Sequence, residues 1–416
     1  MTDRLLSRRL LPALVVLAGA AAPAFAQMAD NDEARATAIL RSGSVPAGAD
    51  RTFLLKYVSD LATTMWDRTG VSFTPPFQNG PPGMTAAVEL ERLRLRAMPF
   101  PVGPNTVSSE AVLNGFAEIY RDAFLPVMSK EPKNPAAFTQ AAFLLADMRA
   151  PVLVPTYQKI YQFPHATAGG RARVMWALQA LRPQTVTQAP VRAFLVEAAK
   201  TETSAAVLYE IFAAMDLTSV SGPNVNQTTL EMIISALRAR LDRYYAGQIA
   251  GLGGEVRALQ TIESLTAGDA PLIGKNKLEL IELLTRLENV AGIRYTEFSK
   301  ANVHMLRMKR QEVLGMRTGA WETLILTDRA LVPLLAGTKP APEKPAMVEE
   351  AFAKLMAKDP LESETSSENS QDHLELLRQL LERRNQVNEV LKAAGYKGPA
   401  NIAEPAPWVE SAGPKK

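Results

Sequence analysis

The residue types that most often carry out chemistry are sparse in this chain. It has 416 residues and no cysteine, and its three histidines are His165, His304 and His373. Without cysteine the chain has no disulfide, no thiol catalysis and no thiolate zinc site. No histidine lies one helical turn from another, so a helix-borne zinc site is not expected either. The sequence therefore predicts no bound metal and no cofactor.

Two glycine-containing segments match nucleotide-binding loops only in part. The segment Gly268–Asn276 has five residues between its glycines, where a phosphate-binding loop has four, and Asn276 stands where that loop needs a hydroxyl. A second cluster consists of Gly247, Gly251, Gly253 and Gly254. The spacing of these glycines differs from that of a dinucleotide-binding loop. We interpret the first segment as a turn between helices and the second as a flexible break between helices.

The signatures of serine nucleophiles are missing as well. Neither Gly-x-Ser-x-Gly nor Ser-x-x-Lys occurs in the chain. A pair of catalytic carboxylates stays open as a possibility, because any two of the 43 Asp and Glu residues could meet in space. No catalytic residue is predicted, and a protein without enzymatic activity is favoured.

The first 26 residues have the three-part pattern of a secretory signal peptide. The apolar stretch Leu10–Ala22 is too short to span a bilayer comfortably, and Ala24 and Ala26 suit signal peptidase. We expect cleavage between Ala26 and Gln27 and an exported protein, periplasmic or extracellular; an uncleaved membrane anchor is the alternative. The arginine pair Arg8-Arg9 also fits the twin-arginine motif, which leaves the export route open.

The charge of the mature chain is close to neutral. The signal removes three of the 46 Lys and Arg and one of the 43 Asp and Glu, which leaves 43 against 42, or about +1. Such a balance gives no reason to expect nucleic-acid binding. No later segment is long and apolar enough to cross a membrane, so no integral membrane segment is expected after cleavage.

The composition favours helices and predicts an all-α fold. Aromatics make up only 6% of the residues, whereas Ala, Leu and Met, which lose little side-chain freedom in a helix, are plentiful. Asn134-Pro135 predicts a helix start, with a capping side chain followed by proline at the first helical position. The helices expected from apolar periodicity cover 29–42, 51–68, 84–98, 135–148, 151–162, 224–245, 255–267, 276–291, 300–316, 319–335 and 371–394.

The middle of the chain shows internal similarity. Phe143–Arg149 aligns with Trp176–Arg182 at an offset of 33 residues, and Glu210–Asp216 follows at an offset of 34. Ala-Pro-Val recurs at 150–152 and at 189–191. Residues 134–216 resemble HEAT-type helical repeats. This resemblance implies a right-handed α-solenoid-like stack of helix pairs with a C-terminal linker and long helix, and an irregular helical bundle is the alternative.

The same comparison places Arg149 and Arg182 at equivalent positions. Ladders of equivalent residues in solenoids usually tie neighbouring repeats together, and we favour that role over ligand binding. The helix 371–394 is strongly amphipathic, so its apolar side must be buried on the repeats or on a partner. The residues of a possible interaction surface are Arg149, Arg182, Leu377, Leu381 and Leu391.

These patterns predict six segments. They are the signal peptide 1–26, N-terminal helices with Pro/Gly-rich loops 27–108, HEAT-like repeats 109–245, a further helical block 246–336, a linker with a short helix and an acidic stretch 337–370, and an amphipathic helix and tail 371–416. A stack of helix pairs exposes an extended surface suited to another polypeptide. The function expected is therefore an exported, non-enzymatic scaffold for protein–protein interaction in the cell envelope. The alternatives are a helical-toroid enzyme acting on envelope or extracellular polysaccharide and an export-linked chaperone.

Overall fold

The computed structural model describes residues 25–67, 86–300, 310–340, 367–399 and 401–407. Within these ranges every regular element is a helix and no strand is present, which confirms the predicted all-α class. The expected signal peptide lies outside the described residues apart from Phe25 and Ala26. Most of the expected linker 337–370 lies outside them as well.

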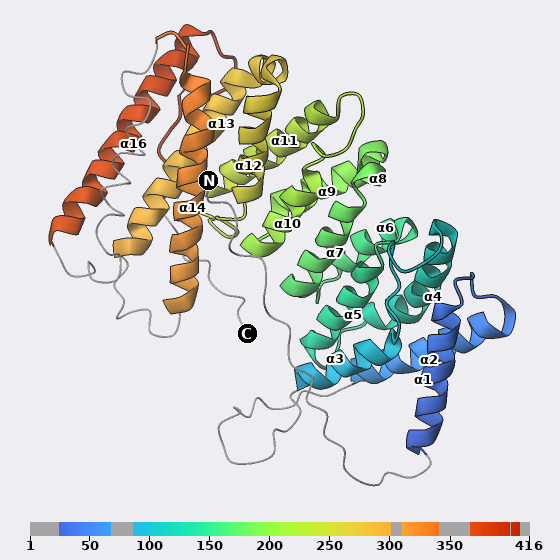
Figure 1. Ribbon diagram of the computed structural model, residues 1–416. Helices are drawn as coiled ribbons and strands as arrows, with labels where there is room; N and C mark the ends of the chain where they lie inside the picture. Colours follow the sequence, from blue (N-terminus) through green and yellow to red (C-terminus); the bar gives the residue numbers. More distant parts are fainter. Residues whose placement is uncertain (1–24, 68–85, 301–309, 341–366, 400, 408–416) are drawn as a thin grey trace, which may run out of the picture.

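The helices follow one another in sequence order from one end of the molecule to the other (Figure 1). Their bounds are α1 Phe25–Arg41, α2 Gly48–Asp67, α3 Ala86–Ala97, α4 Glu110–Met128, α5 Pro135–Met148, the 3₁₀ turn η1 Pro151–Leu153, α6 Val154–Gln162, α7 Ala168–Ala180, α8 Arg182–Thr187, α9 Ala189–Thr201, α10 Ala205–Met215, α11 Val225–Tyr245, α12 Val256–Gly268, α13 Ala270–Lys300, α14 Arg310–Leu335 and α16 Ser367–Ala393.

Contacts between helices form two successions. In the first, α3 packs on α5, α5 on α7, α7 on α10, α10 on α12 and α12 on α14. In the second, α9 packs on α11, α11 on α13 and α13 on α16. The two successions are joined where α10 meets α9 and α14 meets α13, and α6 packs on α7 of the first succession. Most helices therefore pack against elements that are near them in the sequence.

Local signals explain where several helices begin. The side chain of Asn134 accepts a hydrogen bond from the backbone N–H of Ala136 at 3.0 Å, and Pro135 occupies the first turn of α5. This confirms the helix start predicted at Asn134-Pro135. Ser109 caps α4 and Thr167 caps α7 in the same manner, each accepting from a backbone N–H that has no partner inside its helix.

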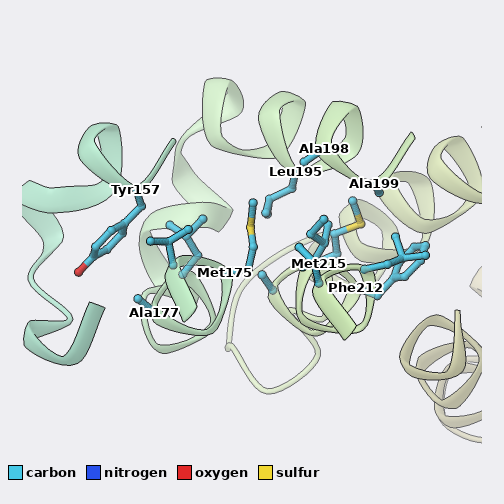
Figure 2. Close-up of a cluster of buried hydrophobic side chains, with 14 of the residues drawn as sticks. Tyr157, Met175, Ala177, Leu195, Ala198, Ala199, Phe212 and Met215 are labelled. Atoms are coloured by element: carbon cyan, nitrogen blue, oxygen red, sulfur yellow. The ribbon is translucent and has the colours of Figure 1, made fainter. Parts of the chain in front are cut away.

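The core lies between the two successions of helices. Figure 2 shows this layer, where Tyr157 of α6, Met175 of α7, Leu195 of α9 and Phe212 of α10 point into one apolar band. All four side chains are fully buried. Burying apolar surface is worth roughly 25 cal/mol per Å², so this continuous layer supplies the main stabilisation of the stack.

The long helix α13 differs from the prediction. A helix was expected over 276–291, but α13 extends from Ala270 to Lys300. The N-terminal cap is Asp269, whose carboxylate accepts from the N–H of Leu272 at 3.3 Å. Asn276 lies inside the helix, so the expected inter-helix turn over 268–276 is limited to Asp269.

Gly292 has a packing role in the interior of α13. A Cβ atom added there would lie 2.3 Å from Cδ1 of Leu380 on α16. Real Cβ contacts are never that short, so glycine is what permits α16 to approach α13 this closely. The helix end expected at residue 291, just before this glycine, was wrong, because a glycine at a helix–helix crossing and one at a helix end look the same in a sequence.

The glycine cluster after α11 is likewise closely packed. Gly251 and Gly253 adopt φ of +89° and +102°, values that favour glycine. A Cβ at Gly253 would lie 2.7 Å from the backbone Cα of Gly319 on α14. The segment expected to be a flexible break is thus a connection held between α11 and α14.

No described helix combines the length and the apolar character that crossing a bilayer requires.

Candidate functional site

A large cavity lies beside the connection between α3 and α4. This connection contains Pro99, Pro101 and Pro104, which cannot continue a helix and end α3 at Ala97, close to the expected 98. The hydroxyl of Thr106 closes a turn, accepting from the N–H of Gly103 at 2.8 Å. A short, proline-rich connection of this kind forms a preformed wall of the cavity.

Two adjoining cavities share this wall. The first has a volume of about 1060 Å³ and lies between α3, the connection and the C-terminal end of α5. The second has a volume of about 470 Å³ and reaches the start of α4 and the end of α7. Three residues line both cavities: Pro104, Asn105 and Arg149. We call the two cavities together the Arg149 groove.

The larger cavity of the groove is lined by more basic than acidic side chains. The arginines Arg92, Arg94, Arg96 and Arg149 line it together with the carboxylates of Glu33 and Asp147. Nε of Arg96 lies 3.2 Å from Glu33, and Nη1 of Arg94 lies 3.6 Å from Asp147. Asp147 is also paired with Arg173 of α7. Both carboxylates of this cavity are therefore already engaged by arginine.

Arg149 is held differently from the other arginines of the groove. It follows the last residue of α5 in the left-handed conformation, with φ of 49°. Its guanidinium lies 4.0 Å from the ring centroid of Trp176 on α7, and its Nε is buried without a hydrogen-bond partner. No carboxylate among the described residues lies within ion-pair distance of it. Its stacking on Trp176 therefore orients the guanidinium without satisfying its N–H donors.

Arg182, at the equivalent position of the next unit, is used to join helices. Its guanidinium donates to the carbonyl oxygen of Ala213 at 3.0 Å and to the hydroxyl of Ser219 at 3.3 Å. Asp216, the third equivalent residue, accepts from Arg257 of α12 at 2.6 Å. Each of the equivalent positions 149, 182 and 216 thus contacts a helix or turn further along the chain. The ladder role favoured for both arginines stays a prediction.

The three leucines expected on an interaction surface differ in how far the structure buries them. Leu391 is fully buried, so it belongs to the core and not to an accessible surface. Leu377 is partly buried against the core, whereas Leu381 is 46% exposed and its neighbour Leu374 is 58% exposed. The reason is that α16 packs along α13, which covers one side of the helix. In addition α16 begins at Ser367, so residues 367–370 of the expected linker are helical.

A buried group of charges joins α16 to the rest of the molecule. The guanidinium of Arg383 is fully buried, with Nη1 at 3.2 Å from Asp328 of α14 and 3.5 Å from Glu288 of α13. Sequence reasoning missed this residue. Arg383 follows Leu380 by three positions and precedes Val387 by four, which is the spacing of the buried side of α16 and could have revealed it.

Arg383 faces two buried carboxylates that also lie close to each other. Burial raises the pKa of Glu288 to about 8; Arg383 lowers it in part, and the neighbouring Asp328 raises it further. The cause is that a carboxylate without water is costly, and a second carboxylate adds repulsion. The pair therefore holds a proton at neutral pH.

This arrangement predicts how stability depends on pH. The folded pKa of Glu288 lies above its ordinary value of 4.5, so its contribution is complete below 4.5 and is lost as pH rises through about 8. We expect Glu288→Gln to remove this loss, on the order of 1–3 kcal/mol, because the amide mimics the protonated acid. Urea unfolding of both proteins between these pH values measures it. Parallel curves for the two proteins would contradict the prediction.

Two further buried carboxylates lie where α9, α11 and the glycine-rich connection meet. Glu255 is fully buried and accepts from Nε of Arg240 at 2.7 Å, and Arg240 also donates to the backbone carbonyls of Ala199 and Glu202. Glu202 accepts a bidentate pair from Arg171 at 2.9 and 3.0 Å. Burial alone would raise the pKa of Glu202, but Arg171 and the N–H of Ser204 hold it below its usual value. Each of these two carboxylates therefore forms an ion pair with an arginine of a helix, Glu255 with Arg240 and Glu202 with Arg171.

Among the described residues no cluster of His, Asp and Glu has the geometry to hold a metal ion. Comparisons of the chain with protein-family models, with characterised proteins and with solved structures found no match.

Proposed function

We propose that this protein is an exported, non-enzymatic helical-repeat scaffold that binds another polypeptide in the cell envelope. The polypeptide is bound in the Arg149 groove, and the fold is a right-handed α-solenoid-like stack of helix pairs. The observation that carries the proposal is the pair of helix successions, in which each helix packs on a helix two or three elements further along the chain. A stack built in this way exposes long surfaces and needs no closed active site.

Equivalent residues support the repeat architecture. Arg149 and Asp216 directly follow α5 and α10, Arg182 lies two residues after the end of α7, and each contacts an element further along the chain. Arginine is well suited to a place near the C-terminal end of a helix, where carbonyl groups lack partners and the helix dipole is negative. Equivalent positions that each contact the next part of the chain support a repeat protein.

The polysaccharide-cleaving alternative is less well supported. Glycoside hydrolysis usually needs two carboxyl groups, one of them free to act as an acid. Both carboxylates of the larger cavity, Glu33 and Asp147, lie within ion-pair distance of arginines. No aromatic side chain on which a sugar could stack is among the described residues that line this cavity. The nearby ring of Trp176 is stacked against Arg149.

A photo-crosslinking experiment tests the proposal. Leu95 is 53% exposed and lines the larger cavity, so a photoreactive amino acid at this position should form an adduct with the partner in intact cells. We expect a discrete, protease-sensitive adduct in the envelope fraction. Tyr209 of α10 is 38% exposed and lines neither cavity, which makes it the matched control position. Equal adducts at both positions, or none at Leu95, would contradict the proposed function.

A further inference from the structure

We infer that the Arg149 groove recognises an acidic, extended polypeptide segment, and that the guanidinium of Arg149 binds a carboxylate of that segment. The inference rests on the proposed function and names the chemistry of the partner. It depends on three properties of the groove: an arginine with unused donors, basic neighbours, and a wall shaped for a peptide.

The first property is the state of Arg149. Stacking on the indole of Trp176 holds the guanidinium plane in place, and no described carboxylate pairs with it. A planar arginine presents its N–H groups as a fork that matches both oxygens of a carboxylate. Because the side chain is already oriented, little conformational freedom is lost when the anion binds.

The second property is the arrangement of charge around it. Arg173 lies 3.7 Å from the same Trp176 ring and is paired with Asp147, so two cations share one aromatic side chain. The larger cavity carries four arginines against two carboxylates. The charged side chains that line the cavity around Arg149 therefore have a net positive charge, which favours an anionic ligand. In the smaller cavity, Glu110 repels a second anionic group, so the acidic residues of the segment belong in the larger cavity.

The third property favours a polypeptide over a sugar or a free anion. Three prolines, the exposed side chain of Leu95 and Met98 give the larger cavity apolar lining between its arginines. An extended peptide alternates side chains, and can place apolar groups on this lining and a carboxylate on Arg149. The shared residues Pro104 and Asn105 connect the two cavities, so the groove continues past Arg149.

The test uses a fluorescein-labelled peptide of alternating glutamate and proline, which stays extended in solution. We expect its anisotropy to rise on binding the full-length protein, and a peptide with glutamine in place of glutamate to bind at least about tenfold more weakly. Binding should also weaken with added salt, as expected for an exposed ion pair.

Arg149→Gly is the decisive variant, because φ of 49° suits glycine and the substitution should not prevent folding. We expect its melting temperature to be retained and its affinity for the acidic peptide to fall about tenfold or more. Arg149→Lys keeps the charge without the planar fork and should lose part of the affinity. Arg378→Gln, at an exposed arginine of α16, is the control and should bind as the unmodified protein does.

Three outcomes would overturn the inference: unchanged affinity in Arg149→Gly, equal binding of the glutamine peptide, or binding of oligogalacturonate in preference to the acidic peptide. The last of these would assign the groove to an acidic sugar. These failures are distinguishable from failure of the proposed function. A polypeptide adduct at Leu95 would still support the scaffold if the acidic peptide does not bind, whereas loss of both would remove scaffold and inference together.

Discussion

A chain that ends at Pro360 is expected to melt far below the full-length protein or to aggregate. The truncation removes α16, which buries Leu376, Leu380, Val387, Val390 and Leu391. Each fully buried aliphatic side chain is worth about 1.5–3 kcal/mol, so the total approaches the whole stability of an ordinary domain, which is about 5–15 kcal/mol. Circular dichroism melts and size-exclusion chromatography of both chains would measure the effect.

The truncation also distinguishes the two roles that the sequence left open for the C-terminal helix. In the structure α16 packs on α13, as expected for a helix that folds back onto the rest of the chain. A truncated chain that keeps its helicity and melting temperature would instead make α16 a detachable docking element.

A pair of neighbouring substitutions supplies the matched control for this experiment. Leu380 is 1% exposed and Leu381 is 46% exposed on the same helix. Leu380→Ala should cost about 2–5 kcal/mol, because it removes buried carbon and leaves a cavity beside Gly292. Leu381→Ala should change the free energy of unfolding by less than about 0.5 kcal/mol. Equal effects would mean that α16 is not packed in the orientation described.

Arg383→Ala is expected to destabilise the protein by about 3–5 kcal/mol at neutral pH. The substitution removes a buried cation that faces both Glu288 and Asp328, and these carboxyl groups come from two different helices. A buried carboxylate without its partner must either bear the full desolvation cost or take up a proton. Urea unfolding followed by circular dichroism would give the change in free energy.

The acid dependence of the same variant identifies the cause. If the loss arises from unpaired carboxylates, it should shrink when the pH is lowered, because protonation removes their charge. Arg383→Ala combined with Glu288→Gln should be more stable than Arg383→Ala alone. Arg378→Ala provides the control, since Arg378 lies on the same helix with a side chain that is 62% exposed. A loss that is the same at every pH would indicate lost packing in place of lost pairing.

Much of the helical architecture follows from local sequence patterns. The all-α class and the start of α5 at Asn134-Pro135 rest on side-chain entropy and on capping, which act within a few residues. The offset of 33 residues between Phe143–Arg149 and Trp176–Arg182 placed Arg149 and Arg182 at equivalent positions before any contact was known. The same reasoning identified α16 as an amphipathic helix with a side to bury.

Only the tertiary structure decided which side chains meet. Arg383 pairs with Asp328, a residue 55 positions away, and Gly292 is needed because Leu380 crosses α13 at that point. The groove likewise arises only when α3, the end of α5 and Trp176 of α7 come together around Arg149. The physical reason is that periodicity and caps describe one helix at a time. Pairing of charges and close approach of backbones depend on how helices distant in the sequence are placed.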